Sequence, residues 1–213
     1  PDDKYIVNLN EYDSFGRPYS VYRPVPTQTS SGAYASFASI NPELLKFYNW
    51  EVYTFSKTLY EDSPLDRPVE KYGPGSLWHT RGKSVRTEYL VNEATGVLSC
   101  GLYLVSSDTS LTRSGVFPSG SLSVVKTTDE DGDVTLSFTD RLGRKVLERR
   151  LDGDIRLDTH YVYDDLGLTR YVLTPEASAA MSSDGTFGDS SAPVAGLSYV
   201  YKYDGKGRCS SKR

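Results

Sequence analysis

The stretch that decides the fold runs from Ser121 to Thr174 and reads SLSVVKTTDEDGDVTLSFTDRLGRKVLERRLDGDIRLDTHYVYDDLGLTRYVLT. Clusters of Asp and Gly separate short runs in which polar and apolar residues alternate. The pattern predicts strands at 121–128, 134–139, 144–151, 155–163 and 168–174. Strands at a spacing of roughly 8–12 residues, with turn residues between them, are typical of an antiparallel meander. The predicted fold class is therefore all-β, an antiparallel meander of hairpins with at most one or two short helices.

The turns carry a signature in which Asp is followed three residues later by Gly. An Asp at the first position of a turn accepts hydrogen bonds from backbone N–H groups further along it, and a Gly at the fourth position takes a positive φ without steric cost. A type I turn followed by a left-handed Gly is a favoured hairpin connection. The sequence therefore predicts repeat turns at Asp13 and Gly16, Asp140 and Gly143, Asp164 and Gly167, and Asp204 and Gly207.

Upstream of the meander the pattern is looser. It predicts strands at 5–9, 18–23, 50–60, 85–91 and 97–105, with the last two forming a hairpin. A short helix is expected over 42–48, because Asn41 can cap its start and Pro42 suits the first helical position.

Two segments rich in small and polar residues, 27–39 and 176–196, are predicted to be mobile loops, and the second is longer than a compact domain usually tolerates without structure. We divide the chain into an N-terminal β-rich part, 1–118, which includes the helix, and a hairpin meander, 119–213, which includes the loop 176–196.

Composition excludes several classes of protein. With 24 Lys and Arg against 28 Asp and Glu, the net charge is −4, which argues against a nucleic-acid partner. No apolar run approaches the about 18 residues of a membrane-spanning helix. Cys100 and Cys209 lie outside any Cys-x-x-Cys pattern, so no structural zinc site is expected; we interpret them as two unrelated thiols, although one disulfide stays open.

An internal repeat emerges when the turns are aligned. Tyr12-Asp13-Ser14-Phe15-Gly16-Arg17 and Tyr203-Asp204-Gly205-Lys206-Gly207-Arg208 share the form Tyr-Asp-x-x-Gly-Arg, Thr139 precedes Asp140 in the second copy, and Leu168 stands in place of Arg in the third. A further block runs from Tyr60 to Gly75 and includes Ser63-Pro64-Leu65-Asp66-Arg67, with Trp78 shortly after. The chain resembles the YD-repeat, or RHS (rearrangement hotspot), family of large bacterial surface and secreted proteins. The further block is similar to a segment toward the front of the repeat region in cell-wall-associated members.

The resemblance carries expectations for fold and function. In that family the repeats form hairpins that join edge to edge into a long spiralling sheet, which in toxin-type members closes into a hollow shell. It implies that this chain is an excised, non-catalytic structural segment of such a protein, located at the cell surface or secreted. The rest of the parent polypeptide would be its main partner, with a glycan or protein at the cell surface as a further one.

Other chemistry has weaker support. His79 and His160 have no nearby nucleophile in a suitable sequence context, and the acidic run Asp129–Asp133 lacks the Gly of a calcium loop. We therefore expect no catalytic, metal or cofactor site. The alternative function is a carbohydrate- or protein-binding module that uses exposed aromatic side chains, for which the candidates are Trp78, Tyr161, Tyr163, Tyr201 and Tyr203. The same tyrosines could instead pack within the sheet.

Overall fold

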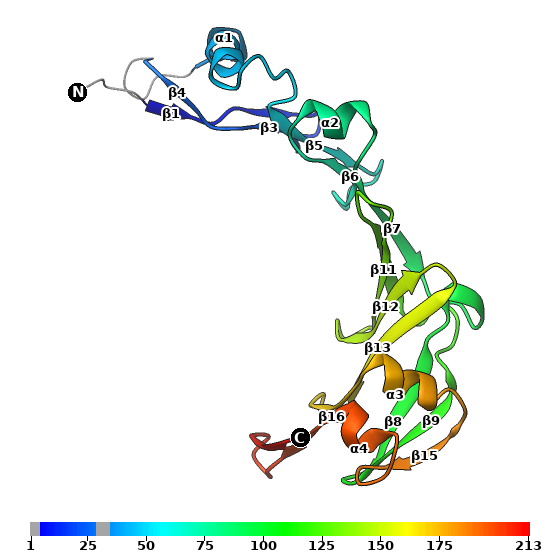
Figure 1. Ribbon diagram of the computed structural model, residues 1–213. Coiled ribbons are helices and arrows are strands. Elements are labelled where there is room, and N and C mark those ends of the chain that lie inside the picture. Colours follow the sequence, from blue (N-terminus) through cyan, green and yellow to red (C-terminus); the bar gives the residue numbers. More distant parts are fainter. Residues whose placement is uncertain (1–4, 29–34) are drawn as a thin grey trace. The chain divides into compact units, whose positions relative to one another are not determined.

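The computed structural model describes residues 5–28 and 35–213. Most of the described chain is antiparallel β-sheet (Figure 1). Twelve strands form one sheet in which neighbours follow the chain order. They are β2 (Asn10–Tyr12), β3 (Pro18–Tyr22), β5 (Phe55–Tyr60), β6 (Pro68–Tyr72), β7 (Val85–Val91), β10 (Ser123–Thr128), β11 (Val134–Thr139), β12 (Lys145–Asp152), β13 (Ile155–Tyr163), β14 (Thr169–Leu173), β16 (Ser198–Tyr203) and β17 (Cys209–Lys212). The predicted all-β, antiparallel fold is confirmed.

Smaller elements accompany this sheet. A two-stranded sheet joins β1 (Tyr5–Val7) to β4 (Val25–Thr27), and a three-stranded sheet has the order β15 (Gly185–Gly188), β9 (Ser110–Val116) and β8 (Gly101–Ser107). The helices are α1 (Phe37–Phe47), α2 (Ser76–Thr80), α3 (Pro175–Ala180) and α4 (Val194–Leu197), with one 3₁₀ turn, η1 (Gly96–Leu98). Four helices in the described residues exceed the one or two that we expected. None of those four is long and apolar enough to span a membrane.

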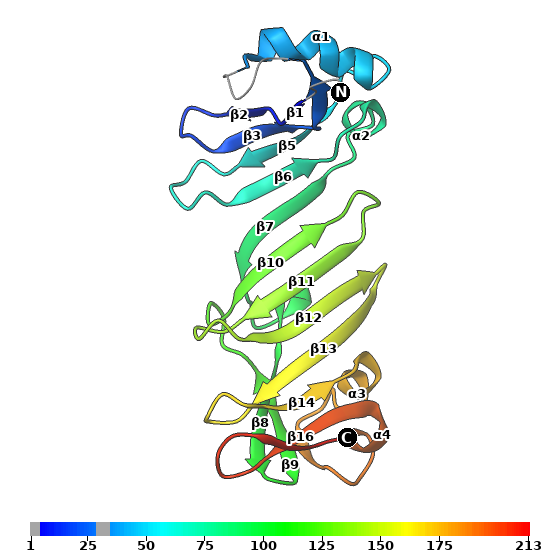
Figure 2. The ribbon, with the colours of Figure 1, turned by 90° about the vertical axis from the view of Figure 1, so that its left-hand side faces the viewer.

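The chain divides into two compact units. The first comprises the residues up to Thr87 together with Thr128–Gly132, and the second comprises Glu88–Thr127 and Asp133–Arg213. In each unit the strands connect in hairpins, and α2, α3 and α4 lie at strand ends away from the repeat turns (Figure 2).

The core of the first unit forms where α1 packs on the strands. Ile40 and Leu44 of α1 are buried with Tyr22 and Val25. The predicted start of this helix is wrong: Ser36 caps it, its Oγ accepting from the backbone N–H of Ser39. Asn41 and Pro42 lie inside the helix because Ser36 already supplies a cap more than one turn earlier. The predicted loop 27–39 is wrong at both ends, because Thr27 belongs to β4 and residues 37–39 to α1, while residues 29–34 lie outside the described residues.

The predicted strand 50–60 is also shorter than expected. Asn49 and Trp50 hold positive φ angles of 52° and 64°, a backbone conformation that is incompatible with a strand. The strand β5 therefore begins only at Phe55.

The second unit contains the meander and a second layer. Strands β11, β12, β13 and β14 match the predicted ranges to within a residue at each end, and each pairs with the next in antiparallel register. The three-stranded sheet and α3 and α4 supply side chains to the core of this unit. The buried members of that core are Tyr103, Leu111, Val162, Tyr171, Leu173, Ala177, Met181, Val194 and Val200.

Two predictions for this unit are wrong: the hairpin between 85–91 and 97–105, and the mobile loop 176–196. Strand β8 pairs with β9 and does not form a hairpin with β7, because the segment after β7 leaves the large sheet. Arg149 fixes that segment: its Nη1 donates to the carbonyls of Val97 (2.6 Å) and Ser99 (2.9 Å), while its Nε and Nη2 bind both carboxylate oxygens of Asp158.

The region predicted as a mobile loop, 176–196, contains α3, β15 and most of α4. Thr174 caps α3 and Pro175 occupies its start, so the helix has a normal N-terminal signal. Strand β15 then pairs with β9. Ala177 and Met181 are fully buried, so this segment belongs to the core.

Candidate functional site

Four turns, which we call the Asp turns (13–17, 140–144, 164–168 and 204–208), share one geometry. In each, the Asp backbone N–H donates to the carbonyl four residues later at 2.9–3.0 Å, and the Gly N–H donates to the Asp carbonyl at 2.9–3.0 Å. The Asp Oδ1 accepts from the backbone N–H groups two and four residues later at 2.9–3.1 Å. The glycines of these turns, Gly16, Gly143, Gly167 and Gly207, have φ angles of +74° to +80°. The Asp carboxylate and the left-handed Gly together fix the backbone.

An arginine closes three of these turns. Nε of Arg17, Arg144 and Arg208 donates to Oδ2 of the Asp of its own turn, at 2.7 Å, 2.8 Å and 2.8 Å. Leu168 occupies the equivalent position of the 164–168 turn, and Arg170 approaches instead, with Nη1 3.6 Å from Asp164 Oδ2.

The carboxylates of these three Arg-closed turns have lowered pKa values. Burial by itself would raise the pKa of Asp13 and Asp140, but hydrogen bonds from the backbone and guanidinium of the arginine in the same turn outweigh it. The backbone N–H and guanidinium of Arg208 lower the pKa of Asp204. The turns are therefore built for the ionised form of Asp.

A tyrosine hydroxyl connects each of three turns to the preceding hairpin, a contact that we call the tyrosine link. Tyr163, just before Asp164, donates to the carbonyl of Lys145, the residue after Arg144, at 2.8 Å. Tyr203, just before Asp204, donates to the carbonyl of Thr169, the residue after Leu168, at 2.9 Å. In the first unit Tyr60 donates to the carbonyl of Pro18, the residue after Arg17, at 3.1 Å. In all three links the donor is the tyrosine directly before the acid of one turn, and the acceptor is the carbonyl directly after the last residue of the preceding turn.

The side chain at the arginine position also contacts the next turn. The guanidinium carbon of Arg144 lies 4.9 Å from the centroid of the Tyr163 ring, and that of Arg17 lies 4.7 Å from the Tyr60 ring. A cation over a tyrosine ring is favourable. Consecutive hairpins are therefore joined by side chains as well as by sheet hydrogen bonds.

The loop after Tyr60, which lies in the further block from Tyr60 to Gly75, is a longer version of the same turn. The Glu61 N–H donates to the carbonyl of Arg67 at 3.0 Å, and Arg67 returns two hydrogen bonds to the Glu61 carboxylate, at 2.6 Å and 2.7 Å. These bonds lower the pKa of Glu61. The signal in the sequence was a tyrosine directly before an acid, with an arginine closing the loop.

The candidate ligand-binding aromatic residues fall into different environments. The hydroxyls of Tyr163 and Tyr203 donate to backbone carbonyls in the tyrosine links. Tyr161 is half-buried on β13, and Tyr201 lies under Lys212, whose Nζ is 5.4 Å from its ring centroid. Trp78 lies on α2 in the first unit, 39% exposed. Ligand binding by these residues stays a prediction.

The histidines are enclosed by aromatic side chains. His79 stacks on Tyr53 at 4.3 Å between ring centroids. His160 is buried beside Tyr103, its Nδ1 is 3.0 Å from Ser178 Oγ, and burial lowers its pKa to about 4. Both cysteines are free thiols, and burial raises the pKa of Cys100 to about 12. Within residues 5–28 and 35–213, no group of three or more His, Cys, Asp or Glu side chains is placed to hold a metal ion.

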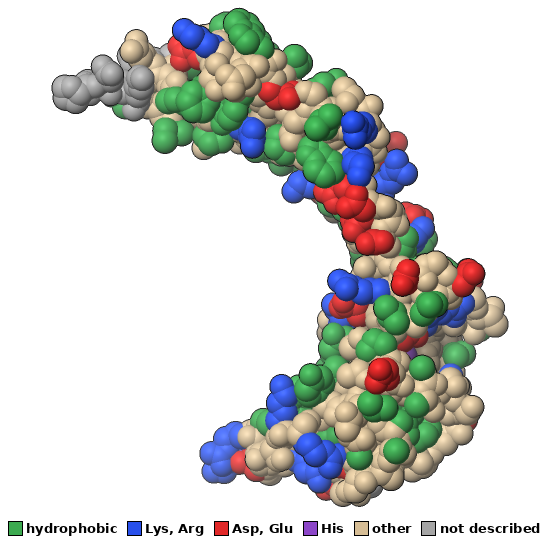
Figure 3. Space-filling model, viewed as in Figure 1, with side chains coloured by type: hydrophobic (Ala, Val, Ile, Leu, Met, Phe, Trp, Pro, Cys, Tyr) green, Lys and Arg blue, Asp and Glu red, His purple; other side chains and the backbone are tan. Residues whose placement is uncertain are grey.

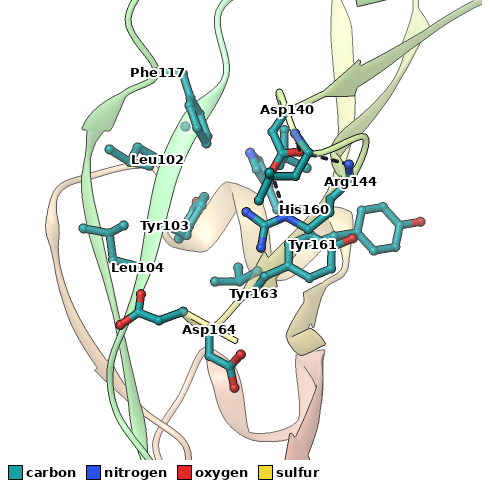
Figure 4. A pocket seen from close by; sticks show the side chains of 15 residues that line it. Leu102, Tyr103, Leu104, Phe117, Asp140, Arg144, His160, Tyr161, Tyr163 and Asp164 are labelled. Carbon is teal, nitrogen blue, oxygen red and sulfur yellow. Dashed lines mark hydrogen bonds and ion pairs between the residues drawn. The ribbon is translucent and has the colours of Figure 1, made fainter. Parts of the chain in front are cut away.

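A cavity of about 330 Å³ lies beside the turns of the second unit (Figure 4). Leu102, Leu104 and Phe117 line one side, and Arg144 and Asp164 line the other. On the face shown in Figure 3, the charged side chains of both signs are interspersed. The cavity and the Asp turns are the main features to which a function can be assigned.

Comparison with known proteins gives two likenesses. Residues 1–91 match the model of a domain of unknown function, DUF6443. Among solved structures, the crystal structure of TcdB2-TccC3-TEV is similar with a TM-score of 0.45 and 16% sequence identity. That match covers 95% of this chain but only 9% of the other. No curated protein matches the chain.

Proposed function

We propose that this chain is a non-catalytic structural segment of a large secreted or surface-exposed RHS/YD-repeat protein, in which it builds part of a shell or stalk. The observation that carries the proposal is the recurrence of the tyrosine link. Tyr60, Tyr163 and Tyr203 each bind the carbonyl directly after the turn of the preceding hairpin. Such regular contacts between neighbours suit a sheet that grows by repetition.

The two parts of the repeat have separate tasks. The Asp carboxylate and the Gly close each hairpin locally, which sets the register of its two strands. The tyrosine then fastens its hairpin to the one before it, and the arginine contacts the tyrosine of the next turn. The stability of such a protein is approximately a sum of repeat terms and nearest-neighbour terms.

The ends of the large sheet support a continuing partner. Strands β2 and β17 are the two edges of its strand order. Edge strands present unpaired backbone N–H and C=O groups to any strand placed beside them. We infer that the rest of the parent polypeptide supplies those strands.

The test is small-angle X-ray scattering with light scattering on the purified chain, alone and with a panel of cell-surface glycans. We expect association that increases with protein concentration and does not respond to any glycan, because the exposed edges pair with each other. A monomer that binds one glycan class saturably would contradict the proposal and favour the carbohydrate-binding module.

A further inference from the structure

Two cavities have the same construction, one in each unit. They measure about 460 Å³ in the first unit and about 330 Å³ in the second. Each is lined by the apolar residue at the tip of one Asp turn, by the arginine of that turn, and by the two acids that open the next turn. These residues are Phe15, Arg17, Glu61 and Asp62 in the first unit, and Leu142, Arg144, Asp164 and Asp165 in the second.

In each cavity one acid has no partner, and the two acids occupy equivalent positions in their turns. Glu61 binds Arg67, and Asp164 accepts two backbone N–H bonds and has Arg170 nearby. Asp62 and Asp165, the residues that directly follow those acids, are exposed and form no hydrogen bond or ion pair with the described part of the chain. Each cavity therefore offers one uncommitted negative charge.

An exposed apolar side chain lies in the lining of each cavity. Phe15 is 80% exposed and Leu142 is 76% exposed, although both are large and apolar. In the second unit Leu102, Leu104 and Phe117 extend the apolar wall (Figure 4). A group that joins an apolar stem to a positive head matches this combination, and the side chains of Lys and Arg have that form.

The second cavity also contains a polar atom without a partner. His160 lines it and is only 5% exposed, and its Nε2 has no hydrogen-bond partner among the described residues. Buried polar atoms without a partner are uncommon in native proteins. The ring of His160 therefore lies beside the cavity with hydrogen-bonding capacity that the described residues leave unused.

We propose that these cavities bind the basic side chains of an extended polypeptide partner. The positive head lies at Asp62 or Asp165, and the stem lies against Phe15 or Leu142. The side chain of a polypeptide fits better than a compact cation, because each cavity places an exposed apolar side chain beside the uncommitted carboxylate and so accommodates the stem as well as the head. The inference stands on the cavities alone and does not require the scaffold function.

The test is a titration of the ¹⁵N-labelled full chain with an acetylated and amidated Gly-Leu-Lys-Leu-Gly peptide, followed by amide chemical shifts. We expect shifts at residues around both cavities, and none from the same peptide with Glu in place of Lys. Asp165→Asn should weaken binding at the second cavity by roughly threefold, the value of one exposed ion pair, and leave the first unchanged. Asp62→Asn should do the converse, so each cavity is the control for the other.

Asp154→Asn is the matched control, because Asp154 is an exposed acid in the turn between β12 and β13, away from both cavities. It should change neither affinity. The proposal is overturned if the Lys peptide shifts neither cavity, or if the Glu peptide binds equally well. It is also overturned if spermidine or glucosamine binds as tightly as the peptide, since the site would then select small cations and not a polypeptide.

Discussion

The 140–144 turn and the 164–168 turn have the same backbone but different side chains at their last position. In both, the Asp Oδ1 accepts two backbone N–H bonds, and the Gly φ is +78° and +80°. Arg144 closes the first turn with an ion pair, whereas Leu168 closes the second without one. The backbone of the turn therefore forms with or without an arginine at its last position.

The side chain at the last position of each turn packs against the next turn. Arg144 lies over the ring of Tyr163, and a Cβ added to Gly167 would lie 3.6 Å from its Nη1. Leu168 occupies the same place one hairpin further on, since a Cβ added to Gly207 would lie 4.0 Å from its Cδ1. Both tyrosine links are present all the same. The turn and the link between hairpins are therefore separable, and each can be broken alone.

The largest effect is expected where both turns depend on glycine. Gly143→Val and Gly167→Val should each lower the free energy of unfolding by about 1–3 kcal/mol, because a β-branched residue is strained at positive φ. Urea denaturation measures it. Gly205→Val is the control, since Gly205 lies in an Asp turn at a φ outside the left-handed region and has open space at its Cβ. Urea midpoints of the two variants equal to that of the parent chain would show that the turn assignment is wrong.

A smaller effect is expected from Arg144→Leu, which makes the first turn resemble the second. It should lower the free energy of unfolding by about 1 kcal/mol at neutral pH, because the charged hydrogen bond to Asp140 is lost. The pKa of Asp140 is lowered in the folded chain, so this stabilisation is complete above the ordinary value of 3.8 and disappears as the pH falls through the lower native pKa. In urea melts the difference in unfolding free energy between parent and variant should therefore be smaller at pH 2.5 than at pH 7. An equal difference at both values would contradict the role of the ion pair.

The smallest effect is expected from the reverse change, Leu168→Arg. It should raise the free energy of unfolding by only a few tenths of a kcal/mol, because Arg170 already lies near Asp164 and a second guanidinium adds little to that ion pair. The combined Leu168→Arg and Arg170→Ala variant should show a larger gain relative to Arg170→Ala alone. If the gain is the same in both backgrounds, Arg170 does not substitute for the missing arginine.

The meander could be predicted because its information is local. Asp140, Gly143, Asp164 and Gly167 mark the turns, and strands between marked turns pair with their neighbours. The Glu61–Arg67 turn was missed because two added residues hide its spacing. The tyrosine links were also beyond prediction, since a hydroxyl and a carbonyl on different hairpins meet only in the folded sheet.

The predictions for the segments inserted into the meander were wrong because their structure depends on contacts between residues far apart in the sequence. The sequence predicts that β8 pairs with β7, because both have a strand-like pattern and are close in the chain. In the structure β8 pairs with β9. Arg149 holds the segment before β8 by hydrogen bonds to carbonyls about fifty residues earlier in the chain. A local sequence pattern does not contain that contact. The composition of residues 176–196 predicts a loop, although Thr174 and Pro175 carry a helix start signal.

In each tyrosine link a hydroxyl fastens one hairpin to the one before it, and Tyr163→Phe removes one such hydroxyl. Tyr161→Phe is the matched control on the same strand, because the Tyr161 hydroxyl forms no hydrogen bond within the described residues. We predict that equilibrium urea unfolding gives a loss of about 1 kcal/mol for Tyr163→Phe and a change within about 0.5 kcal/mol for Tyr161→Phe. Equal unfolding free energies for the two variants would contradict the account.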